Sequence, residues 1–428
     1  MKKVEFLILG AGVSGIFCAK NLLNKRKKNL LVLEKENRAG GLCRSFKLGN
    51  LYYDIGAHAL HKKTLDKHDF AENINSQSVY CQTRKAKIYF MGKFIPHPFQ
   101  LHLFYTPLKV KLKCFFDFLL KKKVPGENFK SWLYSNFGKS ICDLFLIPYN
   151  EKIWRIDLAR LSLNWISRVP VGMVKLLIGL LFPGKKNYST NEYVCYPKVG
   201  GFENLFKKPI EDIQNYIIFD SEVVKLDLAN KTAETKKGEQ FSYEKIISTL
   251  TVDILIKKII NNPDRETLDL AEKLDKVSTC LATFLSAKSN TDLQRVYVPN
   301  NNYFSHRVII NSNSSDFLKQ QQESLFSLEI SYKDKTELPG ENEIKENCIN
   351  LLKDLGFIKE KADIKESRIE YFEYMYPAQT IGLEDAVVKI RKYLERFDCY
   401  TMGRFGSWSY SNIDGIFKES KEIFDRLV

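Results

Sequence analysis

The first forty residues alternate between short apolar runs and one helical pattern. The runs VEFLILG (4–10) and NLLVLEK (29–35) are continuous, as is typical of strands buried on both faces of a parallel sheet. Between them, VSGIFCAKNLLNK (13–25) carries apolar residues at helical spacing. The pattern therefore predicts a strand–turn–helix–strand unit.

Beyond this unit the periodicity changes three times. Residues 65–190 are predominantly helical in pattern, with long amphipathic stretches such as VKLKCFFDFLLKKK (110–123). Residues 215–250 and 280–335 alternate as strands do, and a helix is predicted over 341–357. The tail from Cys399 predicts a strand, a glycine turn and a last helix.

Composition indicates a folded protein with more than one structural unit. The chain has 428 residues, 44% of them hydrophobic and 13% aromatic. Nine cysteines are spread singly without a CxxC pair, which favours free thiols in a reducing compartment over a disulfide scaffold or a metal site. The most apolar later stretch, VKLLIGLLF (174–182), is too short to span a bilayer. We expect a cytoplasmic protein without an integral membrane segment.

A formal net charge of +15 raises the question of a nucleic-acid partner. The lysines are scattered and no nucleic-acid-binding module accompanies them, so we expect none, and expect instead attraction to a phosphate-bearing substrate. The segment 107–125 combines lysines with large apolar residues. It is read either as a helix on a membrane surface or, preferably, as a packed helix whose lysines face solvent.

The turn after the first strand carries a dinucleotide-binding motif. Gly10, Gly12 and Gly15 form G-x-G-x-x-G at a strand-to-helix junction, where the glycines allow a tight turn and close approach of a pyrophosphate. Glu34 follows at the end of the second strand, where a carboxylate binds ribose hydroxyls.

The segment EKENRAGGLCRS (34–45) indicates which dinucleotide is bound. A second glycine pair lets the chain pass close to an extended ligand, and arginine side chains contact phosphate or a flavin ring. The segment resembles the FAD-binding segment of the amine oxidase, phytoene desaturase and sugar mutase superfamily, which implies FAD. The contributing residues are Arg38, Gly40, Gly41, Arg44 and Ser45.

The same resemblance assigns later segments to the cofactor and predicts an interleaved α/β fold. Its cofactor residues are Gly56 before a loop over the flavin, Val223 on a strand facing the adenine, and Gly403, Arg404, Asn412 and Asp414 near the C-terminus. The fold prediction is a Rossmann-like FAD-binding domain in three parts, 1–80, 196–275 and 371–428. A mostly helical domain (81–195) and an antiparallel sheet domain (276–370) are inserted between them.

Several motifs narrow the function: YYDIGAHALH (52–61), PHPFQ (96–100), PYNEKIWRIDLARLSLNWISRV (148–169), NNYFSHRVIINSNS (301–314) and GRFGSWSY (403–410). In this order they resemble the motifs of the UDP-galactopyranose mutase family. The resemblance implies an isomerase that interconverts pyranose and furanose forms of a nucleoside-diphosphate sugar for surface polysaccharide or capsule biosynthesis. Reduced FAD acts there as nucleophile, through flavin N5, at the anomeric carbon.

Residue roles follow from the same resemblance. It implies that Arg168 and Arg307 bind the diphosphate and that His58 lies beside the flavin. The substrate-binding residues that it implies are His97, Gln100, Asn150, Trp154, Tyr376 and Tyr410.

Departures from the family motifs leave alternatives open. His97 replaces a tyrosine that stacks on uracil, so UDP, GDP and dTDP sugars all remain candidates, and Ala57 replaces a glycine. The alternative function is an FAD-dependent oxidase or desaturase of the same superfamily. NAD(P)H as reductant and a homo-oligomeric state are also left open.

Overall fold

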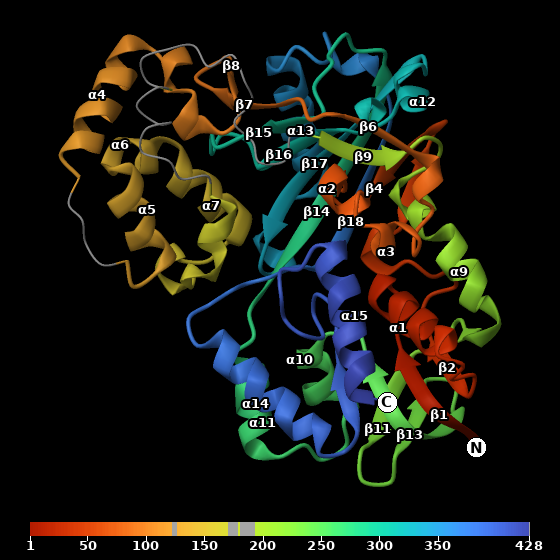
Figure 1. Cartoon of the computed structure of the whole chain (residues 1–428). Helices are drawn as coiled ribbons and strands as arrows, with labels where there is room; N and C mark the ends of the chain where they lie inside the picture. The colour runs from red at the N-terminus through yellow and green to blue at the C-terminus, as the bar shows by residue number, and fades with distance from the viewer. Residues whose placement is uncertain (122–125, 170–178, 180–192, 428) are drawn as a thin grey trace.

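The computed structural model describes residues 1–121, 126–169, 179 and 193–427. Figure 1 shows a lower α/β part that carries both termini, a large sheet above it, and a group of helices beside that sheet. The predicted mixed α/β class with a Rossmann-like unit is confirmed. The predicted helical pattern over 170–192 lies outside the described residues, apart from Gly179.

The lower part is built on a mixed sheet with strand order β10-β2-β1-β13-β12-β11, and β19 pairs with β13. β1 runs parallel to β2 and β13, while β12 is antiparallel to β11 and β13. The strands are β1 (Lys2–Leu9), β2 (Leu30–Leu33), β10 (Ile217–Ile218), β11 (Val223–Asp227), β12 (Thr232–Thr235), β13 (Gln240–Ser248) and β19 (Cys399–Thr401).

Successive side chains of β1 enter two different cores. Phe6 and Ile8 pack with α1 (Val13–Asn24) and α15 (Ile413–Leu427), whereas Leu7 and Leu9 pack with α10 (Val252–Ile254) and α14 (Leu383–Glu395). Successive residues of a strand point to opposite faces, so a continuous apolar run requires cover on both. Two further helices complete this cover, α9 (Lys207–Ile213) beside α1 and α11 (Arg265–Glu272) beside α14.

The second sheet has the order β18-β14-β17-β16-β15-β7-β8. All its pairs are antiparallel except β15 with β7. The strands are β7 (Ala86–Phe90), β8 (Lys93–Pro96), β14 (Lys276–Ala287), β15 (Arg295–Tyr297), β16 (Arg307–Ile310), β17 (Glu323–Tyr332) and β18 (Ile364–Pro377). α13 (Glu341–Asp354) packs against it, and α12 (Asp316–Lys319) follows β16 in the chain.

The helical group packs at the β7–β8 end of this sheet (Figure 1). It contains α4 (Leu108–Leu119), α5 (Phe129–Phe137), α6 (Lys139–Ile141) and α7 (Ile147–Trp154). Two small sheets and two short helices connect the parts. They are β3 (Ser45–Leu48) with β4 (Leu51–Asp54), the sheet β5 (Leu60–His61), β9 (Tyr193–Pro197) and β6 (Val79–Thr83), and the helices α2 (Lys62–Leu65) and α3 (His68–Ala71).

Two elements lie where the pattern predicted none. They are β18 and α14, which lie within residues 364–395. The strand was not predicted because it is only partly buried along most of its length and shows no continuous apolar run. The segment predicted as predominantly helical also contains β6, β7 and β8, of which β7 and β8 extend the large sheet instead of joining the helices.

The prediction that all nine cysteines are free is wrong for one pair. Cys81 and Cys195 form a disulfide between β6 and β9, where they are directly paired residues with Cα atoms 4.0 Å apart. Their separation of 114 positions hid this proximity in the sequence. The other seven cysteines are free and buried.

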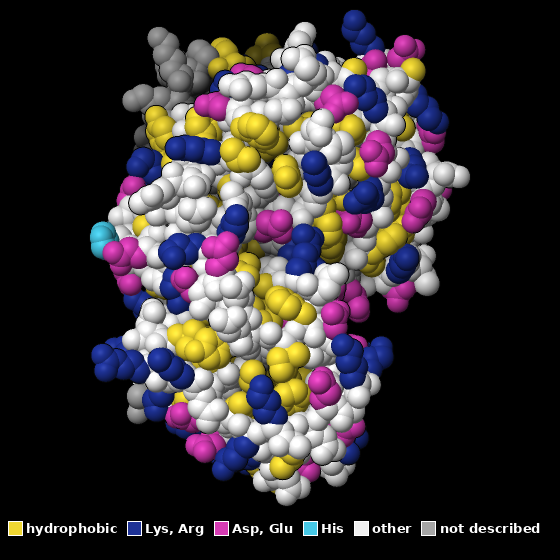
Figure 2. Space-filling view, turned by 90° about the vertical axis from the view of Figure 1, so that its right-hand side faces the viewer, with side chains coloured by type: hydrophobic (Ala, Val, Ile, Leu, Met, Phe, Trp, Pro, Cys, Tyr) yellow, Lys and Arg dark blue, Asp and Glu magenta, His cyan; other side chains and the backbone are white. Residues whose placement is uncertain are grey.

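Within the described ranges, no helix combines the length and the apolar character needed to cross a bilayer. α4 packs through Cys114 and Phe118, yet it exposes Leu108, Leu112 and Phe116 along with lysines. Membrane contact by this segment therefore stays a prediction. On the face drawn in Figure 2, basic and acidic side chains are interspersed instead of forming one basic surface.

Lys152 joins the helical group to the large sheet. Its Nζ, on α7, lies 2.7–3.0 Å from the carbonyl oxygens of Val298, Asn300, Tyr303 and Ser305, which share its three N–H donors. These carbonyls belong to the loop between β15 and β16, so one ammonium group fixes the loop that leads into Arg307.

We predict that Lys152→Met destabilises the protein by roughly 2–3 kcal/mol, because the carbonyls lose charge-assisted hydrogen bonds in a half-buried setting. Denaturant unfolding of the purified chain measures the change. Lys139→Met, at an exposed lysine paired only with Asp143, is the control and should change stability by less than about 1 kcal/mol. Equal effects of the two substitutions would contradict this role of Lys152.

Candidate functional site

The predicted glycine turn connects β1 to α1. Gly10 has φ +96°, and a Cβ on Gly15 would lie 2.0 Å from the carbonyl oxygen of Gly10, so neither position accepts a side chain without strain. α1 begins after Gly12 without a side-chain cap, which leaves the N–H groups of its first turn to a ligand. The geometry is that of a phosphate-binding turn.

Glu34 lies just after β2 and faces this turn. Its Oε2 accepts a 2.6 Å hydrogen bond from the Ala11 N–H, and its Oε1 accepts one of 3.0 Å from the Glu36 N–H. Each carboxylate oxygen keeps a second lone pair for a ribose hydroxyl. The Ser221 N–H donates to the Glu34 carbonyl at 2.8 Å, which brings the start of β11 and Val223 close to the same point.

The second glycine pair touches the first motif. The Gly40 N–H donates to the Ala11 carbonyl at 2.9 Å. Gly41 has φ +54°, and a Cβ there would lie 3.0 Å from the Cα of Gly12. The two glycine segments are therefore in direct backbone contact, so a ligand that extends beyond the first turn would meet the second segment.

The polar side chains on both sides of the glycine pair are engaged in holding this segment. Arg38 donates to the Ser45 carbonyl at 3.1 Å, and Arg44 donates through Nε to the Gly41 carbonyl at 3.0 Å. The Ser45 hydroxyl is buried and donates to Asp54 at 2.5 Å. The Ser45 side chain is thus directed into the protein and holds the segment against Asp54.

The C-terminal loop meets α1. Gly403 has φ +89°, and a Cβ on it would lie 2.3 Å from Ser14 Oγ. Further along, Asp414 at the start of α15 accepts from Thr64 at 3.3 Å, and the neighbouring Asn412 is exposed. Gly403 is therefore close to the glycine turn, whereas Asp414 contacts α2.

Arg307 lies in a buried polar group inside the large sheet. It pairs across β16 and β17 with Glu329, to which its Nε donates, and Glu329 has no exposed surface. Its Nη2 donates to the Tyr376 hydroxyl at 2.9 Å. A Cβ on Gly56 would lie 2.8 Å from Glu329 Oε1, so the predicted flavin loop begins directly against this group.

Three predicted aromatic residues gather beside Arg307. Tyr376 and Tyr410 stack with ring centroids 5.6 Å apart, and the buried Trp154 makes edge contacts of 6.5 and 6.2 Å with them. The Arg404 guanidinium lies 5.4 Å from the Tyr410 ring centroid. These side chains come from segments far apart in the chain and thus form one cluster of aromatic and cationic groups.

His58 stacks on Phe202 with ring centroids 4.9 Å apart. Burial, followed by the charges of Arg404, Arg295 and Arg307, lowers the pKa of His58 to about 3. Its imidazole is therefore neutral near pH 7. Among the residues that the structure describes, its Nδ1 is buried without a hydrogen-bond partner, so it is a polar atom that a bound ligand can satisfy.

The remaining substrate candidates lie at the junction with the helical group. His97 packs on Tyr297 with ring centroids 4.6 Å apart, and Gln100 is buried in the following turn. The Asn150 side chain donates to the Leu146 carbonyl at 2.7 Å, so its amide is partly engaged within its own helix. Arg168 ends a 3₁₀ turn over Leu163–Arg168, and the course of its side chain lies outside the described structure.

Four residues of the site were not predicted from the sequence. Arg84 and Arg295 face a cavity next to His58, Tyr297 contacts His97, and Glu329 holds Arg307. A single acid in the otherwise apolar and small-residue run SLFSLEISY was the visible signal for Glu329. Arg84 and Arg295 carried no local signal, because their proximity depends on pairing between β7 and β15.

Comparisons with known proteins agree with this architecture. A family model described as an NAD(P)-binding Rossmann-like domain matches residues 8–70. The chain is 38% identical over 222 residues to a UDP-galactopyranose mutase of Mycoplasma pneumoniae, and 25% identical over 261 residues to one of Mycoplasma genitalium. These alignments cover 49% and 51% of this chain, and the chain spans about half the length of each relative, 53% and 56%.

Solved structures extend the fold similarity over the whole chain. A reduced UDP-galactopyranose mutase matches with a TM-score of 0.90 at 22% identity, covering 100% of this chain and 94% of the other. A putative protoporphyrinogen oxidase from Exiguobacterium matches with a TM-score of 0.75 at 14% identity over 100% and 98%. The predicted resemblance to the mutases is thereby confirmed in sequence and in fold.

We predict that Gly41→Ala reduces the dinucleotide bound per purified chain several-fold, because the added Cβ would lie 3.0 Å from the Gly12 Cα and push the two glycine segments apart. The ratio is measured by releasing the nucleotide and quantifying it by chromatography. Gly356→Ala is the matched control, since Gly356 also has a positive φ of +68° but nothing within 4 Å of the added Cβ. A similar loss of bound dinucleotide in both variants would show that backbone strain alone, and not contact between the two glycine segments, lowers the binding.

Proposed function

We propose that this protein is an FAD-dependent mutase that interconverts the pyranose and furanose forms of a nucleoside-diphosphate sugar. The observation that carries the proposal is the contact between the Arg307 group and the Gly56–His58 loop. A guanidinium group beside the cofactor loop suits a substrate whose diphosphate leaves and returns during the reaction.

The identity of the cofactor rests on the two glycine segments. Gly12 and Gly41 are in close backbone contact, Glu34 accepts from the Ala11 N–H beside them, and Gly403 packs against Ser14 of α1. A ligand bound at the first turn would continue along the second glycine segment, which favours FAD over a nicotinamide dinucleotide. When bound and reduced, FAD supplies a nucleophile at N5 for the anomeric carbon of the sugar.

The protein groups have distinct tasks in this proposal. Arg307 binds the diphosphate and keeps it near the sugar between departure and return, and Tyr376 adds a hydroxyl to the same group. Arg168 joins Arg307 in this role by resemblance. The neutral His58 offers its Nδ1 to the cofactor or sugar as a hydrogen-bonding group without adding charge.

The nucleotide is expected to lie toward His97, Gln100 and Tyr297, with Asn150 and Trp154 near the sugar. The relatives are named for UDP-galactopyranose, so UDP sugars are the first candidates, followed by GDP and dTDP sugars. We propose a role in surface polysaccharide or capsule biosynthesis in the cytoplasm, with NAD(P)H as a candidate reductant and a homo-oligomer as a candidate assembly.

An FAD-dependent oxidase or desaturase is the second candidate, supported by the fold similarity to a putative protoporphyrinogen oxidase. Such enzymes accommodate apolar or amine substrates. The cationic groups Arg295, Arg307 and Arg404 near His58 are poorly suited to that chemistry and favour the mutase.

The test is anaerobic. The purified protein, reduced with dithionite, is incubated with UDP-, GDP- and dTDP-sugars, and NMR follows the appearance of furanose signals. We expect one sugar to be isomerised by the reduced protein and not by the oxidised one. Bleaching of oxidised flavin by an amine or polyene, without any isomerisation, would favour the oxidase instead.

For the active sugar, we predict that Arg307→Lys lowers kcat by about 10²–10³-fold, because the planar guanidinium loses its fork of donors to the diphosphate and to Glu329. Arg265→Lys, at an exposed residue of α11, should leave kcat within two-fold. Retained flavin and an unchanged melting temperature separate this effect from unfolding. An Arg307→Lys enzyme with wild-type kcat would remove Arg307 from the reaction.

A further inference from the structure

The outward side of α4 carries a row of large apolar side chains. Five of them are 48–78% exposed: Leu108, Leu112, Phe116, Leu119 and Leu120. Leu108, Leu112 and Phe116 follow one another at intervals of four residues, so they lie along one face of the helix. α4 itself lies at the outer edge of the helical group (Figure 1). Exposed apolar rows of this kind are typical of interaction surfaces.

The packing of α4 against the protein uses another side of the helix. Cys114 and Phe118 are buried, and Val110 and Phe115 pack partly against the same core. A helix that covers a core in this way usually carries polar and charged side chains on its opposite face. Core packing therefore does not account for the five outward apolar side chains.

Two lysines lie in the adjoining row of the same face. Lys109 and Lys113 each follow a leucine of the apolar row and are exposed. Neither forms an ion pair with any residue that the structure describes. Asp117, the one acid of α4, accepts a hydrogen bond from the Ser140 hydroxyl of α6. The positive charge on the outward face is therefore not compensated within the helix.

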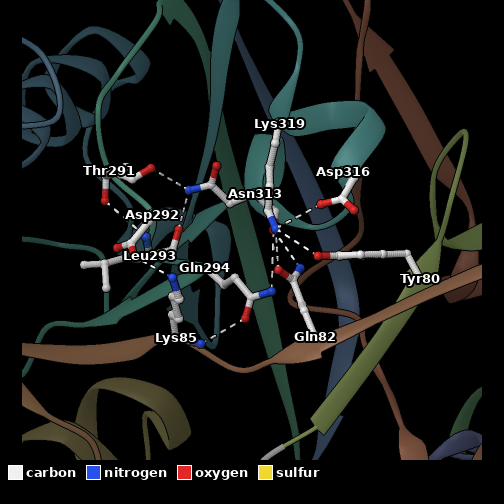
Figure 3. Close-up of polar contacts among 10 residues, drawn as sticks. All are labelled: Tyr80, Gln82, Lys85, Thr291, Asp292, Leu293, Gln294, Asn313, Asp316 and Lys319. Atoms are coloured by element: carbon white, nitrogen blue, oxygen red, sulfur yellow. Dashed lines mark hydrogen bonds and ion pairs between the residues drawn. The ribbon is translucent and has the colours of Figure 1, made fainter.

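The network in Figure 3 shows how other surface lysines of the chain are compensated. Lys85 pairs with Asp292 at 2.7 Å, and Lys319 donates to Gln82 at 2.6 Å and lies 3.5 Å from Asp316. Such lysines have little charge left for a partner. The face of α4, in contrast, combines apolar side chains with free positive charge, which suits an anionic partner with an apolar interior.

Area and charge argue against a second copy of the chain as this partner. The twelve residues of α4 span about 18 Å, and a strip about 10 Å wide along them covers on the order of 200 Å². A stable dimer buries roughly 800 Å² on each subunit. A two-fold contact centred on α4 would also place Lys109 and Lys113 against the same lysines of the second copy.

We propose that α4 binds the surface of an anionic lipid bilayer. Leu112, Phe116 and their apolar neighbours insert at the boundary between headgroups and acyl chains, and Lys109 and Lys113 lie at the level of the lipid phosphates. The contact is peripheral, since the helix lies along the surface. The proposal does not depend on the proposed reaction, because none of the predicted site residues lies on α4.

The test is flotation of the purified flavin-containing protein with lipid vesicles. We expect it to float with vesicles of phosphatidylcholine and phosphatidylglycerol, to float poorly with phosphatidylcholine alone, and to bind less as salt is raised. Leu112→Ser/Phe116→Ser should weaken binding at least about tenfold, because the inserted apolar area is lost. Lys109→Glu/Lys113→Glu should weaken binding to the anionic vesicles by a similar factor.

Two matched control variants change the same kinds of residue elsewhere. Ile381→Ser/Val388→Ser alters exposed apolar residues next to and on α14, and Lys236→Glu/Lys237→Glu alters exposed lysines after β12. Both should bind the anionic vesicles within about two-fold of wild type, because their side chains are not on the binding face. Flavin content and melting temperature verify folding of all four variants.

Three outcomes would overturn the proposal. The first is a wild-type protein that does not float with the anionic vesicles, or α4 variants that float as it does. The second is a dimer in light scattering that Leu112→Ser/Phe116→Ser converts to monomers, without vesicle binding, which would assign the face to a second copy. The third is retention on polyglutamate that Lys109→Glu/Lys113→Glu abolishes, without vesicle binding, which would assign the face to an acidic protein.

Discussion

A carboxylate with no exposed surface, Glu329, lies in the middle of the large sheet and has to be paired there. A buried unpaired charge is far more costly than a buried pair, so Glu329 constrains Arg307 opposite it and Tyr376 beside it. The same carboxylate and the Met375 side chain crowd Gly56, where an added Cβ would lie 2.8 Å from Glu329 Oε1 and 2.4 Å from Met375 Cε, and the φ of +87° there also favours glycine. The ion pair therefore contributes to the shape of the loop that leads to His58 and sets the direction of the arginine proposed to bind the diphosphate.

The two halves of the site reach each other through segments distant in the chain. The glycine turn, Glu34 and Gly41 come from the first 41 residues, and Gly403 packs against Ser14 from the last 26. The large sheet and the helical group supply Arg307, Tyr376 and Trp154. Lys152 holds the loop before Arg307 through four carbonyl oxygens, which ties the helical group to the sheet that carries the ion pair.

Features encoded by neighbouring residues were predictable, and features that depend on tertiary pairing were not. The G-x-G-x-x-G turn, Glu34 and the second glycine pair are local patterns whose backbone needs can be read from the sequence, and the structure brings them together. Arg84, Arg295 and the Cys81–Cys195 disulfide depend on strand pairings between segments more than a hundred residues apart. β18 was not predicted because it is only partly buried along most of its length, which weakens its hydrophobic pattern. α14 has a regular apolar face and could have been predicted from its sequence. Ser45 stays a predicted cofactor residue, and its hydroxyl donates to Asp54.

A crystal structure of the dithionite-reduced protein with FAD and UDP would test the central claim most directly. The account predicts the flavin ring against the Gly56–His58 loop and the UDP diphosphate within hydrogen-bonding distance of Arg307. UDP bound elsewhere, with Arg307 still directed only at Glu329 and Tyr376, would contradict the proposal that this buried ion pair prepares the site for a nucleotide sugar.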